Sequence, residues 1–154
     1  TILSKQYLLA TGGQDTELCL WVVEVGGQML SGGHSLPVIA PHHSLYGHTA
    51  PIMCVRFSTS GLLLASASGD KTVRLWDPIK LLPLAILESH KRYVTSCAFT
   101  DDGVLLAAGS GDRDVHVWKV DGVTNCIGRI GCGPSSSKRV LAKFPSQRFR
   151  ENIK

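Results

Sequence analysis

Three short apolar runs alternate with turn-forming residues in the segment 47–77, which reads GHTAPIMCVRFSTSGLLLASASGDKTVRLWD. The runs contain β-branched and aromatic residues, and Gly, Ser, Thr and Asp residues separate them. Apolar runs of about four to eight residues bounded by such turns are typical of strands. The pattern therefore predicts three antiparallel strands, centred on 52–57, 62–67 and 73–76.

The same pattern returns at once in the segment 89–118, SHKRYVTSCAFTDDGVLLAAGSGDRDVHVW. It aligns with the first segment without a gap, at an offset of 42 residues. Order, spacing and residue type agree, so the chain contains a tandem repeat. The matching pairs are His48 and His90, Phe57 and Phe99, Asp70 and Asp112, and Trp76 and Trp118.

Residues 1–24 repeat the pattern a third time but begin part of the way through a unit. We call residues 1–24 the first unit, segment 47–77 the second and segment 89–118 the third. Aligning Trp21 with the tryptophan of the second unit places Thr11 and Asp15 on its serine and aspartate. The first strand and the Gly-His of this unit would lie before Thr1, where there is no initiator Met. We therefore expect the chain to be a fragment, with further repeats in a longer parent chain.

A repeat of this length that opens on Gly-His and closes on Trp-Asp resembles one unit of a WD-repeat β-propeller. The resemblance implies an all-β fold, a partial propeller of about three blades with the first truncated, followed by an irregular basic tail. The expected organisation is units at about 1–24, 46–77 and 88–118, a final outer strand at about 120–130, a propeller part at 1–131 and a basic, disordered tail at 132–154.

Three stretches point to one group of such proteins: LLATGGQDTELCLW, LYGHTAPIMCVRFSTSG and ESHKRYVTSCAF. They resemble the last blades of the WD-repeat, sterile-alpha-motif and U-box proteins, over roughly residues 7–118. Members of that group are ubiquitin ligases in which the propeller is taken to select substrates. No helical bundle or U-box follows Trp118, so we expect ligase chemistry to be absent from this chain.

Three residues of the second unit, His48, Ser66 and Asp70, have the side-chain types of a hydrolase triad. The nucleophile position is Thr in the first unit and Ala108 in the third, so we expect no enzyme activity. The resemblance implies a structural tetrad instead, in which Trp donates its indole N–H to Ser, while Ser and Asp bond to His. Such bonds satisfy buried polar atoms that would each cost about 1–3 kcal/mol unpaired. The tetrad positions are His48, Ser66, Asp70 and Trp76, then His90, Asp112 and Trp118, and in the first unit Thr11, Asp15 and Trp21.

A partner-binding face is expected where the inner strands begin and where the following turns lie, since the resemblance places both at one mouth of the propeller channel. Tyr93 is the best anchor because it combines a rigid aromatic body and a polar tip with the neighbouring cations Lys91 and Arg92. The alternative is an exposed tyrosine with no partner. The expected face comprises Gln14, Pro51, Met53, Arg92, Tyr93 and Thr95.

The segment 24–44, EVGGQMLSGGHSLPVIAPHHS, is rich in Gly, Ser and Pro and contains His34, His42 and His43. We expect a solvated excursion between the third and fourth strands of the first blade, rejoining at Ser44–Tyr46. No Cys or carboxylate stands near these histidines at ligand spacing, which disfavours a metal site.

Composition and charge add three points. No apolar run is long enough for a membrane span, and no signal-peptide core is present. Five cysteines, an odd number, indicate reduced thiols in an intracellular protein, cytoplasmic or nuclear. Lys and Arg number 8 against 10 acids up to Trp118 but 8 against 2 from Lys119 onward, so the net charge of +4 belongs to the tail.

The sequence therefore predicts a protein-interaction scaffold built from WD repeats, without a cofactor, whose partner is another protein of unknown identity. One alternative is the substrate-recognition part of a ubiquitin ligase complex. Nucleic-acid association through the basic tail is a second alternative; phosphate contacts would make it strongly dependent on salt. It is disfavoured because only Phe144 and Phe149 are available to stack on bases.

Overall fold

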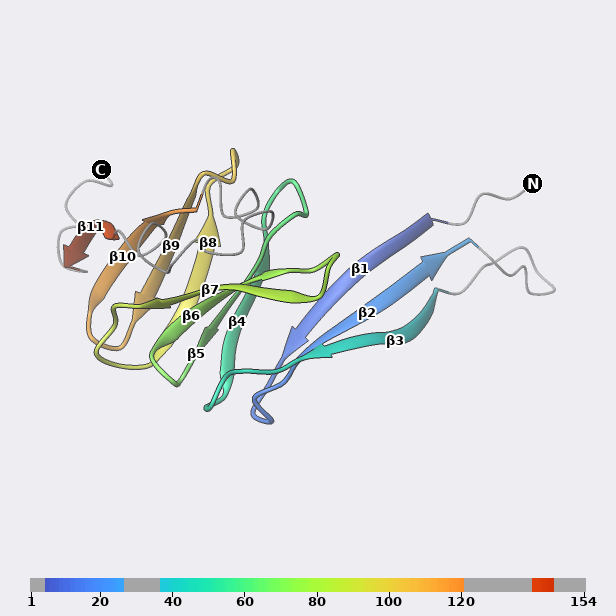
Figure 1. The fold of residues 1–154 in the computed structure, drawn as a ribbon, viewed down its shortest axis with the longest axis horizontal. Coiled ribbons are helices and arrows are strands. Elements are labelled where there is room, and N and C mark those ends of the chain that lie inside the picture. Colours follow the sequence, from blue (N-terminus) through green and yellow to red (C-terminus); the bar gives the residue numbers. More distant parts are fainter. Residues whose placement is uncertain (1–4, 27–36, 121–139, 146–154) are drawn as a thin grey trace.

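The computed structural model describes residues 5–26, 37–120 and 140–145 of the chain, and within these ranges its regular structure is entirely β (Figure 1). Its eleven strands form three antiparallel sheets, which confirms the predicted all-β class. Nothing in the described ranges forms a helix able to cross a membrane. The strands are β1 (Lys5–Gly12), β2 (Leu18–Val25), β3 (Val38–Leu45), β4 (Ile52–Phe57), β5 (Leu64–Ser68), β6 (Thr72–Asp77), β7 (Leu82–Glu88), β8 (Val94–Phe99), β9 (Leu105–Ser110), β10 (Asp114–Lys119) and β11 (Val140–Pro145).

We refer to the sheets as sheet A (β1–β3), sheet B (β4–β7) and sheet C (β8–β11). In each sheet, strands that follow one another in the sequence are hydrogen-bonded neighbours. Short turns join most of these pairs, because antiparallel neighbours can be joined by very few residues, whereas longer segments connect β2 to β3 and β10 to β11. The predicted strands of the second unit appear as β4, β5 and β6, and those of the third unit as β8, β9 and β10.

The three units share one turn conformation between the strands β1 and β2, β5 and β6, and β9 and β10. The residue after the turn aspartate has a positive φ, 67° at Thr16, 74° at Lys71 and 70° at Arg113. This conformation is uncommon for residues other than glycine, so its recurrence identifies one conserved geometry within the chain. In each case the aspartate accepts the amide N–H two residues later: Asp15 from Glu17, Asp70 from Thr72 and Asp112 from Asp114.

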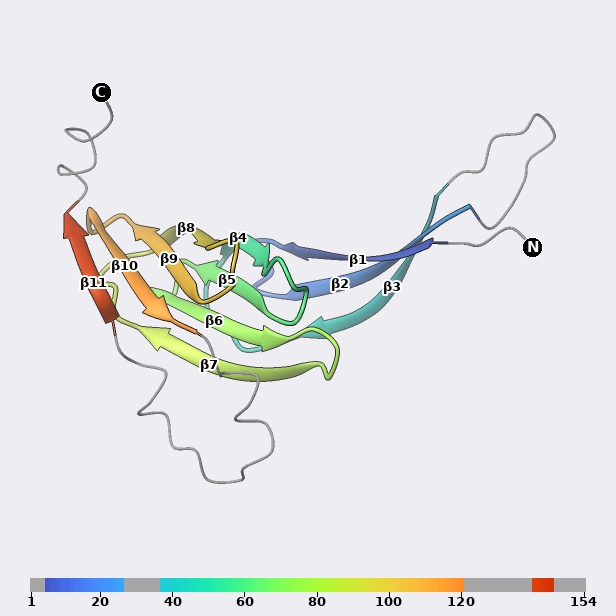
Figure 2. The same ribbon diagram turned by 90° about the horizontal axis from the view of Figure 1, so that it is seen from above.

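The sheets lie in a row, with sheet B between sheets A and C (Figures 1 and 2). Trp76 of sheet B packs with Leu18 and Leu20 of sheet A. Trp118 of sheet C packs in the same way in a cluster with Leu75 and other apolar residues of sheet B. Both tryptophans are 1% exposed, and large aromatic side chains contribute strongly to packing. The repeated tryptophan is therefore the residue that joins each sheet to the one before it.

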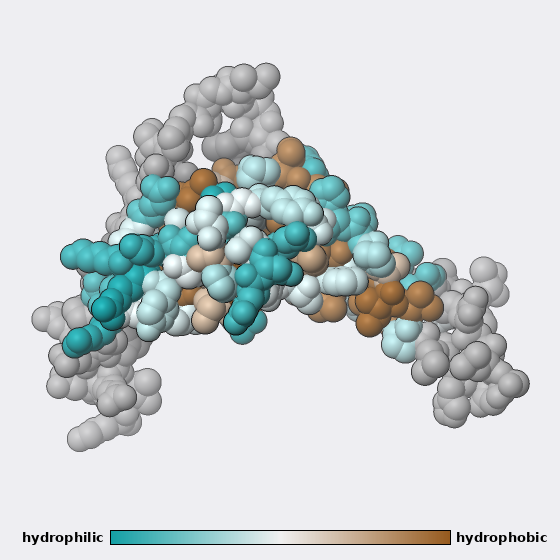
Figure 3. All heavy atoms as spheres, turned by 90° about the horizontal axis from the view of Figure 1, so that it is seen from below, coloured by the Kyte–Doolittle hydropathy of each residue, from teal (hydrophilic) through white to brown (hydrophobic). Residues whose placement is uncertain are grey.

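Sheet A has one face and one edge without a neighbour among the described residues. β1 pairs only with β2. Leu8 and Ala10 pack toward sheet B, so strand alternation places Tyr7 and Leu9 on the opposite face, where they are 55% and 44% exposed. Trp21, directly opposite Leu9, is only half-buried, unlike its two equivalents. Figure 3 shows hydrophobic side chains gathered at this end of the molecule.

The last strand of sheet A begins earlier than predicted. The sequence placed the end of the histidine-containing excursion at Ser44–Tyr46, whereas β3 starts at Val38 and pairs with β2 along its whole length. Pro41 made this stretch resemble a loop. It is accommodated at a shift of register between Leu20 and Trp21, a place where a strand tolerates proline.

The outer strand of sheet C also differs from the prediction. It is β11, which pairs with β10 and lies inside the segment 132–154 where disorder was expected, so that expectation is corrected at 140–145. The segment VLAKFP is the most apolar part of the tail, and β10 offers it a free edge. The strand predicted at 120–130 lies outside the described residues, except for Val120.

Candidate functional site

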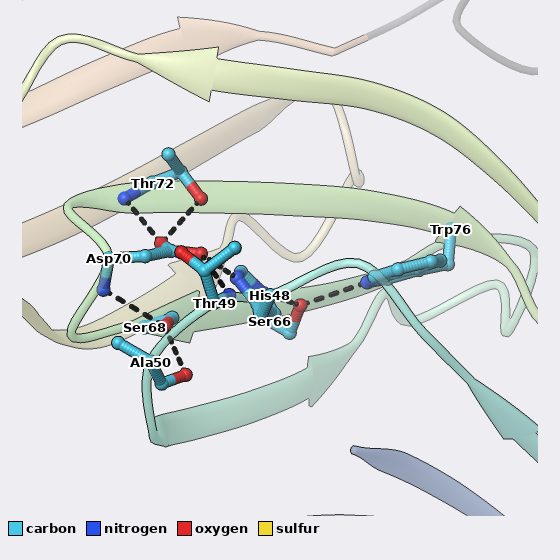
Figure 4. A network of polar contacts seen from close by, with 8 residues as sticks. All are labelled: His48, Thr49, Ala50, Ser66, Ser68, Asp70, Thr72 and Trp76. Atoms are coloured by element: carbon cyan, nitrogen blue, oxygen red, sulfur yellow. Dashed lines mark hydrogen bonds and ion pairs between the residues drawn. The ribbon is translucent and has the colours of Figure 1, made fainter. Parts of the chain in front are cut away.

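The four tetrad residues of the second unit form a network that runs along sheet B from the turn at Asp70 to Trp76 (Figure 4). The indole N–H of Trp76, in β6, donates to Ser66 Oγ in β5 at 2.8 Å. Ser66 Oγ lies 2.7 Å from His48 Nε2, and His48 Nδ1 lies 2.7 Å from Asp70 Oδ2. A continuous run of three hydrogen bonds therefore joins the strands β5 and β6 to the loop that leads into β4.

The direction of these bonds follows from the carboxylate of Asp70, which is ionised and can only accept. Nδ1 of His48 therefore carries the proton donated to Asp70, and in the neutral ring Nε2 accepts the O–H of Ser66, whose oxygen accepts from the indole of Trp76. Burial lowers the pKa of His48 and outweighs the opposite effect of Asp70, so the ring is neutral at pH 7, as the network requires.

The carboxylate of Asp70 accepts more hydrogen bonds than any other group of this network. Besides facing His48, it accepts the amide N–H and the hydroxyl of Thr72, at 3.0 and 2.7 Å, and the amide of Thr49 at 3.2 Å. Burial alone would raise the pKa of Asp70, but the hydrogen bonds from Thr72 and His48 lower it to about 2. The ionised carboxylate thus holds the loop before β4 against the turn between β5 and β6.

A second set of bonds, not predicted from the sequence, joins the same loop and turn. Ser68 Oγ donates to the carbonyl of Ala50 at 2.8 Å and accepts the amide of the turn aspartate at 3.1 Å. In the third unit, Ser110 bonds in the same way to the carbonyl of Arg92, at 3.1 Å. The two serines are separated by the repeat offset of 42 residues, and that recurrence was the available signal.

The third unit keeps only part of the network. His90 Nδ1 lies 3.0 Å from the carboxylate of Asp112, which also accepts the amide of Lys91 at 2.8 Å. Ala108 stands where the second unit has its serine, so no hydroxyl links histidine to tryptophan there. His90 Nε2 is buried without a hydrogen-bond partner among the described residues, and the ring stacks on His116 with centroids 4.1 Å apart.

We expect Ala108→Ser to be neutral or slightly stabilising. Ala108 is buried, and a hydroxyl at this position of the repeat would face the unpaired Nε2 of His90, so both groups gain a partner. Ala67→Ser is the matched control, because Ala67 is equally buried in the same apolar cluster as Ala108 but does not occupy the tetrad position of its unit. The control should cost about 1–3 kcal/mol. Urea unfolding measures both variants; equal losses would show that the third unit has no room for the hydroxyl.

The first unit retains one bond of this kind. The indole N–H of Trp21 donates to Thr11 Oγ1 at 2.9 Å. Asp15 accepts the amide of Glu17 at 3.3 Å and holds the turn. The link from aspartate to histidine has no counterpart in the described part of this unit.

Ser66 is poorly placed to act as a nucleophile. Its side chain is fully buried, and its hydroxyl both accepts from Trp76 and donates to His48. Covalent catalysis needs a nucleophile that reaches the substrate. The arrangement of Ser66, His48 and Asp70 instead fixes the position of loops.

The residues expected to contact a partner lie around the loops that these networks hold. Met53 and Tyr93 are the large ones, 54% and 49% exposed. The smaller or charged ones are also exposed, except that Pro51 is half-buried. We call the set the loop face; it comprises Gln14, Pro51, Met53, Arg92, Tyr93 and Thr95.

Backbone hydrogen bonds fix the loop face. The amide of Gly111 donates to the carbonyl of Tyr93 at 3.0 Å, and the equivalent bond in the second unit ends on the carbonyl of Pro51 at 2.9 Å. The amide of Ile52 donates to Gly13 at 2.9 Å and joins the loops of sheets A and B. A Cβ on Gly111 would lie 2.6 Å from the ring of Tyr93, so the ring rests directly on this glycine.

Positive charge surrounds Tyr93. Lys91 and Arg92 precede it, and Arg113 belongs to the turn on which its ring rests; all three are exposed. The two ion pairs found among the described residues both join a histidine to an aspartate, so the side chains of these three cations form no ion pair there, although the carboxylate of Asp112 accepts the backbone amide of Lys91. The loop face around Tyr93 is therefore aromatic and cationic.

The histidines of the long excursion do not come together as a metal site in the described part of the chain. His42 and His43 are exposed on β3, and His34 lies outside the described residues. Within the described ranges, no group of three or more His, Cys, Asp or Glu side chains is arranged to hold a metal ion.

Two regions of the chain match a known repeat sequence. The WD40 family profile, described as "WD domain, G-beta repeat", matches residues 39–77 and 81–119, half of the chain. The matched regions contain β4 to β10, all of β3 except Val38, and the turn networks of the second and third units.

Proteins similar to this chain carry the same repeats. "WD repeat, SAM and U-box domain-containing protein 1" of Danio rerio is 35% identical over 88 residues, 57% of this chain and 17% of the relative. "Periodic tryptophan protein 2 homolog" of Schizosaccharomyces pombe is 39% identical over 71 residues, 46% and 7% respectively. "Serine-threonine kinase receptor-associated protein" of Rattus norvegicus is 37% identical over 75 residues, 49% and 17%. The chain thus spans less than a fifth of each of these relatives.

Proposed function

This chain belongs to the WD40-repeat family, and from that premise we propose that it is a protein-interaction scaffold whose partner binds the loop face around Tyr93. Recognition in this proposal needs neither a cofactor nor a reaction. The partner is held by shape, apolar contact and charge, while the buried polar networks keep the contacting loops in place.

Large exposed side chains on fixed loops carry this proposal. Met53 and Tyr93 are each about half exposed, although both stand at the start of strands whose backbones are hydrogen-bonded. Aromatic residues, Met and Arg are enriched at protein interfaces, and a rigid anchor loses little entropy on binding. A partner would therefore gain contact area here at low cost.

The cations around Tyr93 favour a partner segment that carries carboxylates beside an apolar or aromatic group. Lys91, Arg92 and Arg113 are exposed without a carboxylate partner among the described residues. Charge complementarity of this kind raises association rates and discriminates among partners. Binding should accordingly weaken as salt concentration rises.

Tyr93→Ala is expected to reduce partner capture at least tenfold and to leave the fold intact. The substitution removes an exposed ring, and loss of an interface anchor typically costs about 2 kcal/mol or more. Affinity-tagged chains expressed in cells, followed by quantitative proteomics, measure the proteins bound by each variant.

Ile79→Ala is the matched control for this substitution. Ile79 is 69% exposed but lies in the turn between β6 and β7, at the opposite end of the strands from the loop face. It should leave capture unchanged. Equal losses for both variants, or loss of folding in Tyr93→Ala, would contradict the assignment of Tyr93 to a binding face.

A finer role is the selection of substrates for a ubiquitin ligase. The likeness to the Danio rerio relative, whose name includes a U-box, favours it. In that case, proteins captured through Tyr93 should carry ubiquitin, and their ubiquitination should fall in cells that express only Tyr93→Ala. Capture of partners without any change in their ubiquitination would contradict a role in ubiquitin-ligase substrate selection but not the general scaffold role.

Nucleic-acid association through the tail is not developed further. Its basic residues follow Trp118, and the structure describes only Lys119, Val120 and the backbone of β11 in that part of the chain. An intracellular location fits the proposal, since Cys19, Cys54 and Cys97 are free thiols.

A further inference from the structure

Two cysteines from different sheets meet at the junction of sheets B and C. Cys54 lies in β4 and Cys97 in β8, and the Sγ atoms are 3.9 Å apart. Cys54 Sγ also approaches the carbonyl oxygen of Cys97 at 3.8 Å. The pair is not a product of the repeat, because the residue equivalent to Cys54 in the third unit is Ser96.

We propose that Cys54 and Cys97 form a reversible disulfide that links adjacent sheets, with a low-molecular-weight disulfide such as oxidised glutathione as the oxidant. A disulfide has its sulfurs about 2.05 Å apart, so the two Sγ atoms must approach by about 1.9 Å. Rotation of both side chains about χ1 shares this movement between them. The strands that carry them belong to separate sheets that are packed together but not hydrogen-bonded to each other.

The different surroundings of the two thiols set the order of the steps. Cys54 is partly exposed, so its thiolate attacks the small disulfide, forms a mixed disulfide and releases one small thiolate. Cys97 is 5% exposed, and burial raises the pKa of its thiol, so it does not react first. Cys97 then loses its proton to solvent, and its sulfur attacks the Cys54 sulfur and releases the second small thiolate. Two protein thiols are oxidised by two electrons, and the small disulfide is reduced to two thiols.

The link would hold together β4 and β8, which together with the loops that lead into them carry all of the loop face except Gln14. Met53 is adjacent to Cys54 in β4, and Thr95 lies two residues before Cys97 in β8. A covalent bond between β4 and β8 therefore restricts movement of sheet B against sheet C. Because it also closes a chain loop in the unfolded state, it should raise the thermal midpoint by several degrees.

The test uses the full chain with Cys19, Cys126 and Cys132 changed to serine, which leaves only the proposed pair. After incubation with oxidised glutathione and alkylation of free thiols, trypsin should release the peptides 6–56 and 93–113 joined by a disulfide. Non-reducing electrophoresis of the undigested chain should show the oxidised protein in the monomer band. The thermal midpoint should rise on oxidation and return on reduction.

A matched control moves one thiol by a single residue. In Cys97→Ser with Ser96→Cys, the thiol lies on the opposite side of β8, because successive side chains alternate across a strand. This variant should give at least tenfold less of the intramolecular link. Three outcomes would overturn the proposal: Cys54 that stops at the glutathione adduct while Cys97 stays free, a link that forms only between two chains, or equal yields from the pair and the control.

Discussion

Asp70→Ala is expected to lower the free energy of unfolding by about 1–3 kcal/mol, because it removes the acceptor of the buried His48 ring N–H and of the half-buried donors of Thr72. Its carboxylate bonds to His48 and to the amide and hydroxyl of Thr72. Hydrogen exchange should localise the effect, with amides of β5 and β6 exchanging about 5- to 100-fold faster and those of sheet A little changed.

Asp102→Ala is the matched control. Asp102 also accepts a turn amide, that of Val104 at 3.0 Å, but it is exposed and faces no buried histidine. Its loss should therefore stay within about 0.5 kcal/mol. Equal effects of the two substitutions would contradict the role assigned to the network around His48.

The cost of Asp70→Ala should also shrink in acid. The pKa of Asp70 is about 2 in the folded chain against an ordinary value of 3.8. The stability that its carboxylate contributes is therefore fully present above pH 3.8 and is lost as pH falls from about 4 to 2. Protonation of His48 also lowers the stability of the wild-type chain in acid, because its lowered pKa makes protonation favour the unfolded chain below pH 6.5. Urea unfolding at pH 7 and pH 2 should show a smaller difference between wild type and variant at the lower pH.

The isolated chain is expected to self-associate. The outer face of sheet A exposes Tyr7 and Leu9, and β1 has an edge that pairs with no strand among the described residues. The three described sheets form an open row in Figures 1 and 2, and such repeats bury their faces only against neighbours. An apolar face beside a free strand edge promotes pairing with a second chain. Sedimentation should therefore show assemblies that grow with protein concentration.

Leu9→Lys should weaken this association several-fold, because charge on an edge strand opposes pairing. Leu62→Lys is the control: Leu62 is 48% exposed, close to the value for Leu9, but lies in the turn between β4 and β5. A compact monomer at every concentration, with one sharp unfolding transition, would show that the outer face of sheet A needs no neighbour.

Local patterns predicted the parts of the fold that are locally determined. The strands β4–β6 and β8–β10 were found because each is an apolar run between turn formers and two copies recur at one offset, although β5 begins two residues later than predicted, at Leu64. The bonds among His48, Ser66, Asp70 and Trp76 were expected from the resemblance, and the structure places these residues as that geometry requires.

The features that depend on long-range pairing were not predictable in the same way. β11 is a strand because it pairs with the free edge of β10. The basic sequence around 140–145 does not reveal this pairing. β3 tolerates Pro41 because it is an edge strand whose pairing with β2 shifts register there. The approach of Cys54 to Cys97 depends on how two sheets pack, and no spacing along the chain encodes it.

Site-specific photo-crosslinking in living cells tests the binding face most directly. A benzophenone side chain is introduced in place of Tyr93 in one chain and in place of Ile79 in another, both of which are exposed but at opposite ends of the strands. The proposed function predicts a discrete crosslinked protein from the chain labelled at Tyr93 and none from the chain labelled at Ile79. Crosslinks of equal yield from both, or from Ile79 alone, would contradict the loop face as the site of partner binding.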